Sequence, residues 1–266
     1  RPEILAYGEG PRMAGGGDRN ALDKPADGLQ VFRSTPAKTG RLQWTLANPD
    51  DNVGQMFGDD LQMLPGSAAS LVVGSGYMSA PLLLFEGRDA EGWKRDALPL
   101  PPQTYLWSAA PLRQRRAGIL EIVGTGMSFD AGVKLRFIDL YRRGSAGWER
   151  KPIWAEEKKN RGPVRVAAGD LDGNGLDDVV VMGANGEVWM LLRMGIDRWL
   201  LEQSPEMQGP AGCTGYGLRV QDLDLDGRLK VPPLFAGESS ALFDPMACTE
   251  NGGLKVWKLA TKADSR

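Results

Sequence analysis

Histidine is absent from the 266 residues. Without an imidazole, the chain cannot use a Ser-His-Asp or Cys-His mechanism, and it cannot form an HExxH zinc site. The sequence also has no P-loop and no GxGxxG fingerprint following a strand. Two cysteines are too few for a cysteine-histidine metal cluster. We therefore assign no catalytic residue from the sequence.

A strong charge and a long apolar run are lacking as well. The net charge is −2, from 32 basic and 34 acidic residues. A nucleic-acid-binding protein would normally have a basic balance. No apolar run approaches the roughly 18 residues that a membrane-spanning helix needs. We expect a partner other than nucleic acid and no membrane span.

The two cysteines leave their redox state open. Cys213 and Cys248 are 35 positions apart, which is compatible with one disulfide or with two free thiols. The sequence begins with Arg1, as either a trimmed chain or a processed mature chain would. A disulfide would fit an oxidising compartment outside the cytoplasm.

Turn-forming residues are abundant. They lie between short strand-like segments that recur in the same order along the chain. The 35 glycines and 18 prolines make up about a fifth of the chain, against roughly 12% in average proteins. An apolar run ending on glycine is followed by a strand with a large apolar residue and a charge, and in most repeats by a Trp-led strand. The apolar runs lie at residues 4–8, 71–74, 121–124, 179–183 and 234–237.

The spacing between the last two elements of the repeat is regular. Phe85 precedes Trp93 by eight residues, while Tyr141 precedes Trp148 and Leu192 precedes Trp199 by seven. This spacing leaves one tight turn between antiparallel strands. A four-stranded unit of about fifty residues has the size of a propeller blade. A β-sandwich or a β-barrel is the alternative, but neither fold requires the same four-strand order to recur along the chain. The tryptophans are expected to pack between blades, or to stack on a sugar at the rim.

We therefore predict an all-β fold, a single β-propeller domain of about five four-stranded blades. The first repeat starts after its first strand and the last stops after its third, so closure of the ring stays open. The expected blades cover residues 1–50, 51–100, 101–160, 161–213 and 214–266, and the whole domain covers 1–266.

One acidic loop has the spacing of an ion site. It places oxygen-bearing side chains at positions 1, 3, 5 and 9, with glycine at 6 and a backbone carbonyl at 7. Six or more oxygens suit Ca²⁺ better than Mg²⁺. An EF-hand would need Glu at position 12, where Val181 stands, and flanking helices in place of the apparent strands. The expected ligands are Asp170, Asp172, Asn174, Leu176 and Asp178.

Residues 166–181 resemble an FG-GAP (VCBS) repeat. Such repeats build the calcium-binding β-propellers of integrin alpha subunits and of many secreted bacterial proteins. The resemblance implies side-chain ligation by Asp170, Asp172, Asn174 and Asp178 and carbonyl ligation by Leu176. An acidic turn without an ion is the alternative interpretation. A catalytic carboxylate pair is another, although no nucleophile stands nearby.

The other repeats depart from this pattern. In the fifth, Asp222, Asp224 and Asp226 keep positions 1, 3 and 5, but Lys230 stands at position 9. That loop is a weaker second calcium site, or one in which the ammonium replaces the ion. Because the other repeats lack its full pattern, the acidic loop at residues 170–178 is expected to be a structural clip.

Three further surface features have two interpretations each. Basic clusters at Arg113, Arg115 and Arg116 and at residues 158–161 either contact an acidic polysaccharide or form a solvated surface. Residues 10–27 form a long loop, either for binding or disordered.

The expected function follows from the ion loop and the absent catalytic groups. We expect a non-enzymatic, calcium-stabilised propeller that is secreted or periplasmic and binds a glycan or a protein. It would be a monomer or part of a larger chain. The alternative is a lyase-like polysaccharide-degrading enzyme that uses Tyr, Lys or Arg with calcium.

Overall fold

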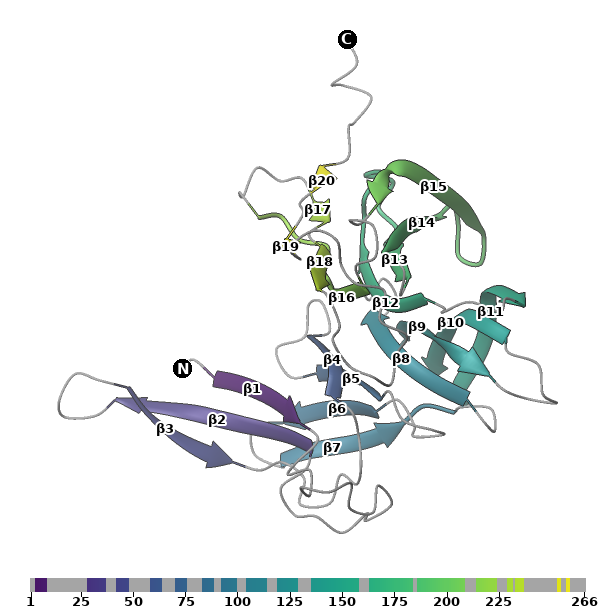
Figure 1. The fold of residues 1–266 in the computed structure, drawn as a ribbon. Helices are drawn as coiled ribbons and strands as arrows, with labels where there is room; N and C mark the ends of the chain where they lie inside the picture. The colour runs from purple at the N-terminus through teal and green to yellow at the C-terminus, as the bar shows by residue number, and fades with distance from the viewer. Residues whose placement is uncertain are drawn as a thin grey trace, which may run out of the picture.

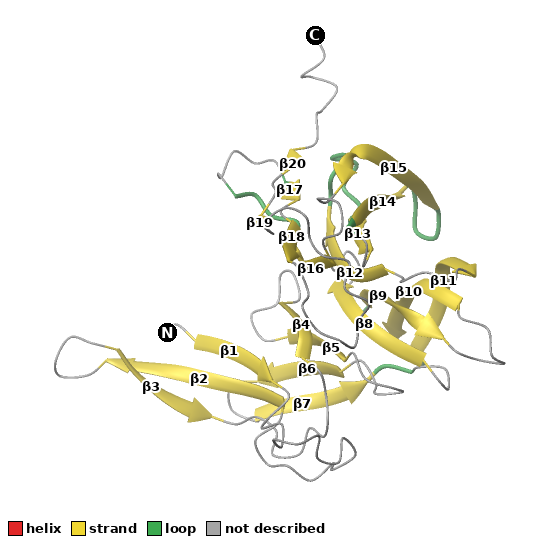
Figure 2. Ribbon diagram, viewed as in Figure 1, coloured by secondary structure: helices red, strands yellow, loops and turns green. Residues whose placement is uncertain are grey.

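Antiparallel β-sheets make up the fold of the protein, as the ribbon diagrams show (Figures 1 and 2). The computed structural model describes residues 3–8, 28–36, 42–47, 58–63, 70–75, 83–88, 92–99, 104–113, 119–128, 135–157, 163–183, 186–208, 214–223, 229–231, 233–236, 253–254 and 257–258. Every regular element over these residues is a strand, which confirms the all-β prediction. None of them belongs to a helix that could cross a membrane. Cys213, Cys248 and the loop at 10–27 lie outside the described residues.

The first two sheets come from the N-terminal part of the chain. The first has the order β1-β2-β3, formed by Glu3–Gly8, Gly28–Pro36 and Leu42–Ala47. The second has the order β4-β5-β6-β7, formed by Gly58–Met63, Ser70–Ser75, Leu83–Arg88 and Gly92–Ala97.

The third and fourth sheets follow along the chain, and each has four strands. The third sheet consists of β8 to β11, at Thr104–Pro111, Leu120–Ser128, Leu135–Gly144 and Gly147–Glu157. The fourth consists of β12 to β15, at Pro163–Gly169, Asp178–Gly183, Glu187–Arg193 and Trp199–Gln208.

The C-terminal strands are shorter. A three-stranded sheet joins β16, β18 and β19, at Thr214–Leu218, Pro233–Ala236 and Gly253–Leu254. A pair joins β17 and β20, at Lys230–Val231 and Trp257–Lys258. Each sheet thus takes all its strands from one of the five segments that the sequence delimits. The described strands do not close into a ring.

The first strands of successive sheets lie next to one another. β8 contacts both β4 and β12, and β12 contacts β16 (Figure 1). The side chain of Gln62 on β4 even reaches β12, where its amide nitrogen donates to the carbonyl of Val166 at 3.0 Å. The sheets therefore meet along their first strands.

Three hydrophobic clusters fill the spaces between neighbouring sheets from the second sheet onward. On β10, Phe137 and Tyr141 join the cluster against the second sheet, while Ile138 and Leu140 join the cluster against the fourth. Because alternate side chains of a strand point to opposite faces, a sheet with a neighbour on both sides needs apolar residues at successive positions. All six residues of β13 are buried, and its apolar run at 179–183 meets this need.

Tryptophans pack between the third and fourth sheets. The rings of Trp154 on β11 and Trp189 on β14 meet edge to face, with centroids 4.7 Å apart. Both belong to the cluster that the two sheets share.

Gly169 ends β12 where the fourth sheet approaches the segment that follows β16. A Cβ atom at Gly169 would lie 2.6 Å from a methyl carbon of Val220 and 2.8 Å from a methyl carbon of Leu229. Only glycine fits this contact without displacing its neighbours, and Gly169 directly precedes the acidic loop.

Gly169→Ala is therefore expected to destabilise the protein by about 1–3 kcal/mol, because the added methyl group overpacks the contact. Urea denaturation measures the loss. Gly144→Ala is the matched control, since a Cβ at Gly144 meets nothing within 4 Å. Equal urea midpoints for the two variants would show that the close approach at Gly169 is not a constraint.

A buried carboxylate lies in the core of the third sheet. Asp139 on β10 has no exposed surface, and its Oδ2 accepts from the Arg150 Nε at 2.6 Å. Its Oδ1 has no hydrogen-bond partner among the described residues. Burial raises the pKa of Asp139 to about 6, against the opposing attraction of Arg150. The group is enclosed and has no surface to offer a substrate.

Asp139 gives stability a defined pH dependence. Between its ordinary pKa of 3.8 and its folded pKa of about 6, the folded protein holds a proton that the unfolded chain releases. The stabilisation from this proton is complete at low pH and is lost as the pH rises through the folded value. Between about pH 4 and about pH 7, the free energy of unfolding measured with urea should fall for the original protein, and Asp139→Asn should remove this fall. Parallel stability profiles for the variant and the original protein would contradict the assignment.

Candidate metal centre

The loop between β12 and β13 is a tight turn that depends on glycine. Gly173 and Gly175 adopt φ angles of 75° and 83°, a region that side chains disfavour. Asn174 donates its backbone N–H to Asp172 Oδ1 at 2.9 Å, and Leu176 donates its N–H to Asn174 Oδ1 at 2.6 Å. These contacts hold alternate side chains on the inside of the loop.

Three carboxylates converge in this loop. Asp170, Asp172 and Asp178 each offer one oxygen, and these oxygens lie within 4.8 Å of one another. Asp178 is fully buried, Asp172 is exposed and Asp170 is intermediate. The Oδ1 of Asp170 is buried and has no hydrogen-bond partner among the described residues. A buried anionic oxygen without a donor is costly, and a cation would satisfy it.

Asp178 is fixed by two backbone donors. Its Oδ2 accepts from the N–H of Leu171 and its Oδ1 from the N–H of Arg193, each at 2.8 Å. Burial raises the pKa of the Asp178 carboxyl, and the nearby Asp172 charge acts in the same direction, while the two backbone donors oppose them. The loop therefore brings negative charges together at an electrostatic cost.

The other two expected ligands lie in the same loop. The side-chain amide of Asn174 donates to Asp172 Oδ2 at 3.0 Å and to the carbonyl of Arg193 on β14 at 2.9 Å. Its Oδ1, the atom that a metal would use, accepts from the Leu176 N–H. Leu176 itself is half-buried. Asn174 thus connects the loop to β14.

An ion pair that the sequence analysis missed holds the outer side of the loop. The backbone N–H of Arg113 donates to Asp177 Oδ2 at 2.5 Å and its Nε donates to Asp177 Oδ1 at 2.6 Å. Its Nη2 also lies 3.5 Å from Asp170 Oδ2. Arg113 follows β8, so this contact joins the third sheet to the fourth.

The Arg113 side chain is 47% exposed, which agrees with the solvated-surface interpretation, and its guanidinium also pairs with the acidic loop. The Asp177–Asp178 doublet was the available signal, since consecutive side chains point in different directions. The remaining residues of the two basic clusters lie outside the described part of the chain.

The corresponding loop of the fifth segment contains a cation of its own. Gln221 pairs with Lys230 in the register in which Gly169 pairs with Asp178, so Lys230 takes the place of the Asp178 carboxylate. Lys230 is 5% exposed, and its Nζ lies 3.7 Å from Asp222 Oδ1. This geometry favours an ammonium in place of an ion. Asp224 and Asp226 lie outside the described residues.

Arg193 connects the acidic loop to the third sheet. Its backbone binds Asp178 and Asn174, while its guanidinium donates to both carboxylate oxygens of Glu121 on β9, at 2.8 and 3.1 Å. Burial alone would raise the pKa of Glu121, but hydrogen bonds from Arg193 and Arg142 hold it below its usual value. The Arg193 guanidinium also lies 5.2 Å from the centroid of the Trp199 ring.

Comparison with known proteins yields a similarity of fold only. No family model matches the chain, and no curated protein sequence matches it. The crystal structure of AofleA from Arthrobotrys oligospora is similar with a TM-score of 0.53 at 13% identity, over 88% of this chain and 63% of that one. A structure of NanB plus Optactamide has a TM-score of 0.46 at 13% identity, over 78% of this chain and 32% of that one.

Proposed function

We propose that the β12–β13 loop binds one Ca²⁺ ion that stabilises the fold. The side chains of Asp170, Asp172, Asn174 and Asp178 and the carbonyl of Leu176 would hold it. The observation that carries this proposal is the convergence of three carboxylate oxygens within 4.8 Å, beside the unpartnered Asp170 Oδ1. Such a set of hard oxygen ligands suits calcium, and the bound ion would neutralise their mutual repulsion.

The role of the ion is structural. The loop connects β12 to β13, and its contacts with the Arg193 backbone attach it to β14. An ion held by the loop therefore stabilises three strands of the fourth sheet at one end. Because both oxygens of Asp178 already accept backbone hydrogen bonds, we assign the carboxylates ion binding in preference to proton transfer.

At the level of the whole chain, we propose an extracytoplasmic β-propeller that serves as a binding or scaffold module for a glycan or a protein. Support comes from the five-segment repeat, from the adjacent first strands of successive sheets, and from the resemblance of residues 166–181 to FG-GAP repeats. A stabilising calcium loop suits a calcium-rich exterior, where even weak sites of this kind are filled.

Removal of calcium should lower the melting temperature of the protein. A ligand that binds only the folded state stabilises it by about 2.7 kcal/mol when present at 100 times its Kd. We expect Asp172→Ala to remove most of the difference between melts in Ca²⁺ and in chelator. Asp172 is exposed, so its truncation perturbs the core little.

Glu202→Ala serves as the control, because it removes an exposed carboxylate of β15, away from the loop, and should leave the calcium response intact. Differential scanning calorimetry provides the measurement. A melt of the original protein that is the same in Ca²⁺ and in excess chelator would refute the ion proposal.

A further inference from the structure

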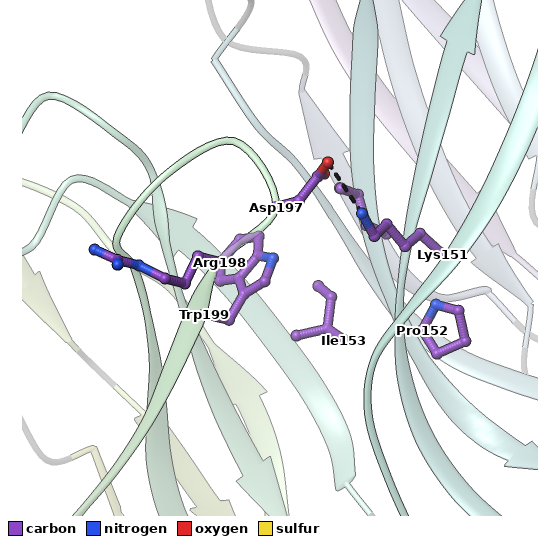
Figure 3. Close-up of a pocket in the computed structure, with 7 residues that line it drawn as sticks. Lys151, Pro152, Ile153, Asp197, Arg198 and Trp199 are labelled. Carbon is purple, nitrogen blue, oxygen red and sulfur yellow. Dashed lines mark ion pairs between the residues drawn. The ribbon is translucent and has the colours of Figure 1, made fainter.

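A cavity of about 240 Å³ lies between the third and fourth sheets. It opens where β11 faces the turn between β14 and β15 (Figure 3). This volume is below the roughly 300–1,000 Å³ of sites for drug-sized ligands, so the cavity suits a single small ring. The residues that form its sides are Lys151, Pro152, Ile153, Asp197, Arg198 and Trp199.

Four of the seven residues that line the cavity are apolar: Leu140, Pro152, Ile153 and Trp199. Trp199 and Pro152 lie on opposite sides with Ile153 between them (Figure 3). Trp199 and Ile153 are half-buried, and both pack against the hydrophobic cluster that the two sheets share. The Arg193 guanidinium lies over the Trp199 ring and also donates to the carbonyl of Ile196 at 2.8 Å, so the indole is held in place.

The rim of the cavity is polar. Asp197 Oδ2 lies 3.0 Å from Lys151 Nζ, and Asp197 Oδ1 lies 3.0 Å from the Nη2 of Arg142. The Asp197 and Lys151 side chains are 41% and 43% exposed, so each can still bind a ligand. A carboxylate beside an ammonium presents an acceptor and a donor at the spacing of neighbouring hydroxyl groups.

The third sheet has the same arginine–tryptophan pair, but there the indole N–H already has an acceptor. Arg143 stands opposite Trp148 as Arg193 stands opposite Trp199, and each guanidinium lies over its ring, at 5.4 and 5.2 Å. The Trp148 indole N–H donates to Asp96 of the second sheet at 3.0 Å. None of the described residues accepts a hydrogen bond from the Trp199 indole N–H, which can therefore donate to a ligand, while the Arg193 guanidinium lies over the ring.

We propose that this cavity binds one neutral pyranose ring of a glycan. The C–H face of the sugar would pack on Trp199 and Ile153, and adjacent hydroxyls would bind Asp197 and Lys151. A purely apolar ligand would shield the Asp197–Lys151 pair from water without offering it a hydrogen bond. The inference rests on the proposed binding role and specifies its ligand class.

Arg193 couples this cavity to the ion loop. Its backbone binds Asp178 and Asn174, and its side chain supports Trp199. Chelation is therefore expected to weaken sugar binding as well. Sugar binding is tested first in saturating Ca²⁺, so that the two proposals can fail separately.

Saturation-transfer NMR and calorimetric titration of the full chain with neutral methyl pyranosides test the proposal, with a methyl glucuronide as the acidic probe. At least one neutral methyl pyranoside should bind. Trp199→Ala and Asp197→Asn should each weaken binding at least about tenfold. Leu200→Ala, which truncates the exposed neighbour of Trp199, should leave affinity unchanged, and all three variants should keep their calcium-dependent melting.

Each alternative outcome has a defined meaning. If no neutral pyranoside binds while Ca²⁺ still raises the melting temperature, the cavity proposal fails and the ion proposal stands. Exclusive binding of the glucuronide, or affinity that survives both cavity variants, also overturns it. Should Trp199→Ala unfold, Asp197→Asn with Trp199 intact still decides the question. If the protein binds a sugar but its melting temperature does not respond to Ca²⁺, the ion proposal alone is overturned.

Discussion

Electrostatic repulsion among three clustered carboxylates governs the loop that ties the third and fourth sheets together. Asp178 is fully buried, Asp170 has an unpartnered buried oxygen, and both lie close to Asp172. Like charges at this range cost free energy unless a cation or hydrogen-bond donors offset them. Backbone donors and Arg113 offset part of this cost, and calcium would offset the remainder.

The effect of the loop extends beyond the hairpin because its partners belong to other elements. Arg113 ties the loop to the third sheet, and Arg193 ties it to β14, to Glu121 and to Trp199. Between the same two sheets lies the shared hydrophobic cluster, at whose margin the cavity opens. One end of the interface thus combines an acidic loop, a charge network and a cavity, so an ion bound in the loop would also order the cavity.

Local patterns predicted much of this, and non-local placement accounts for what they missed. The apolar runs and tight turns predicted the strands because both signals lie within one hairpin, and the substitution at position 9 pointed to the ammonium of Lys230 beside Asp222. The pairing of Arg113 with Asp177 spans 64 positions and depends on how two sheets pack, so the Asp177–Asp178 doublet could mark a second carboxylate at the loop but not its partner. The cavity beside Trp199 was missed for the same reason: it exists only between two sheets.

The most direct test of the central claim is a crystal structure of the protein grown with Ca²⁺. We expect a density peak with anomalous signal in the β12–β13 loop, at roughly 2.3–2.6 Å from the oxygens of Asp170, Asp172 and Asp178 and from the Leu176 carbonyl. The same crystal should show the Lys230 ammonium beside Asp222 with no ion. A loop that holds only water at hydrogen-bond distances, in crystals saturated with calcium, would contradict the central claim.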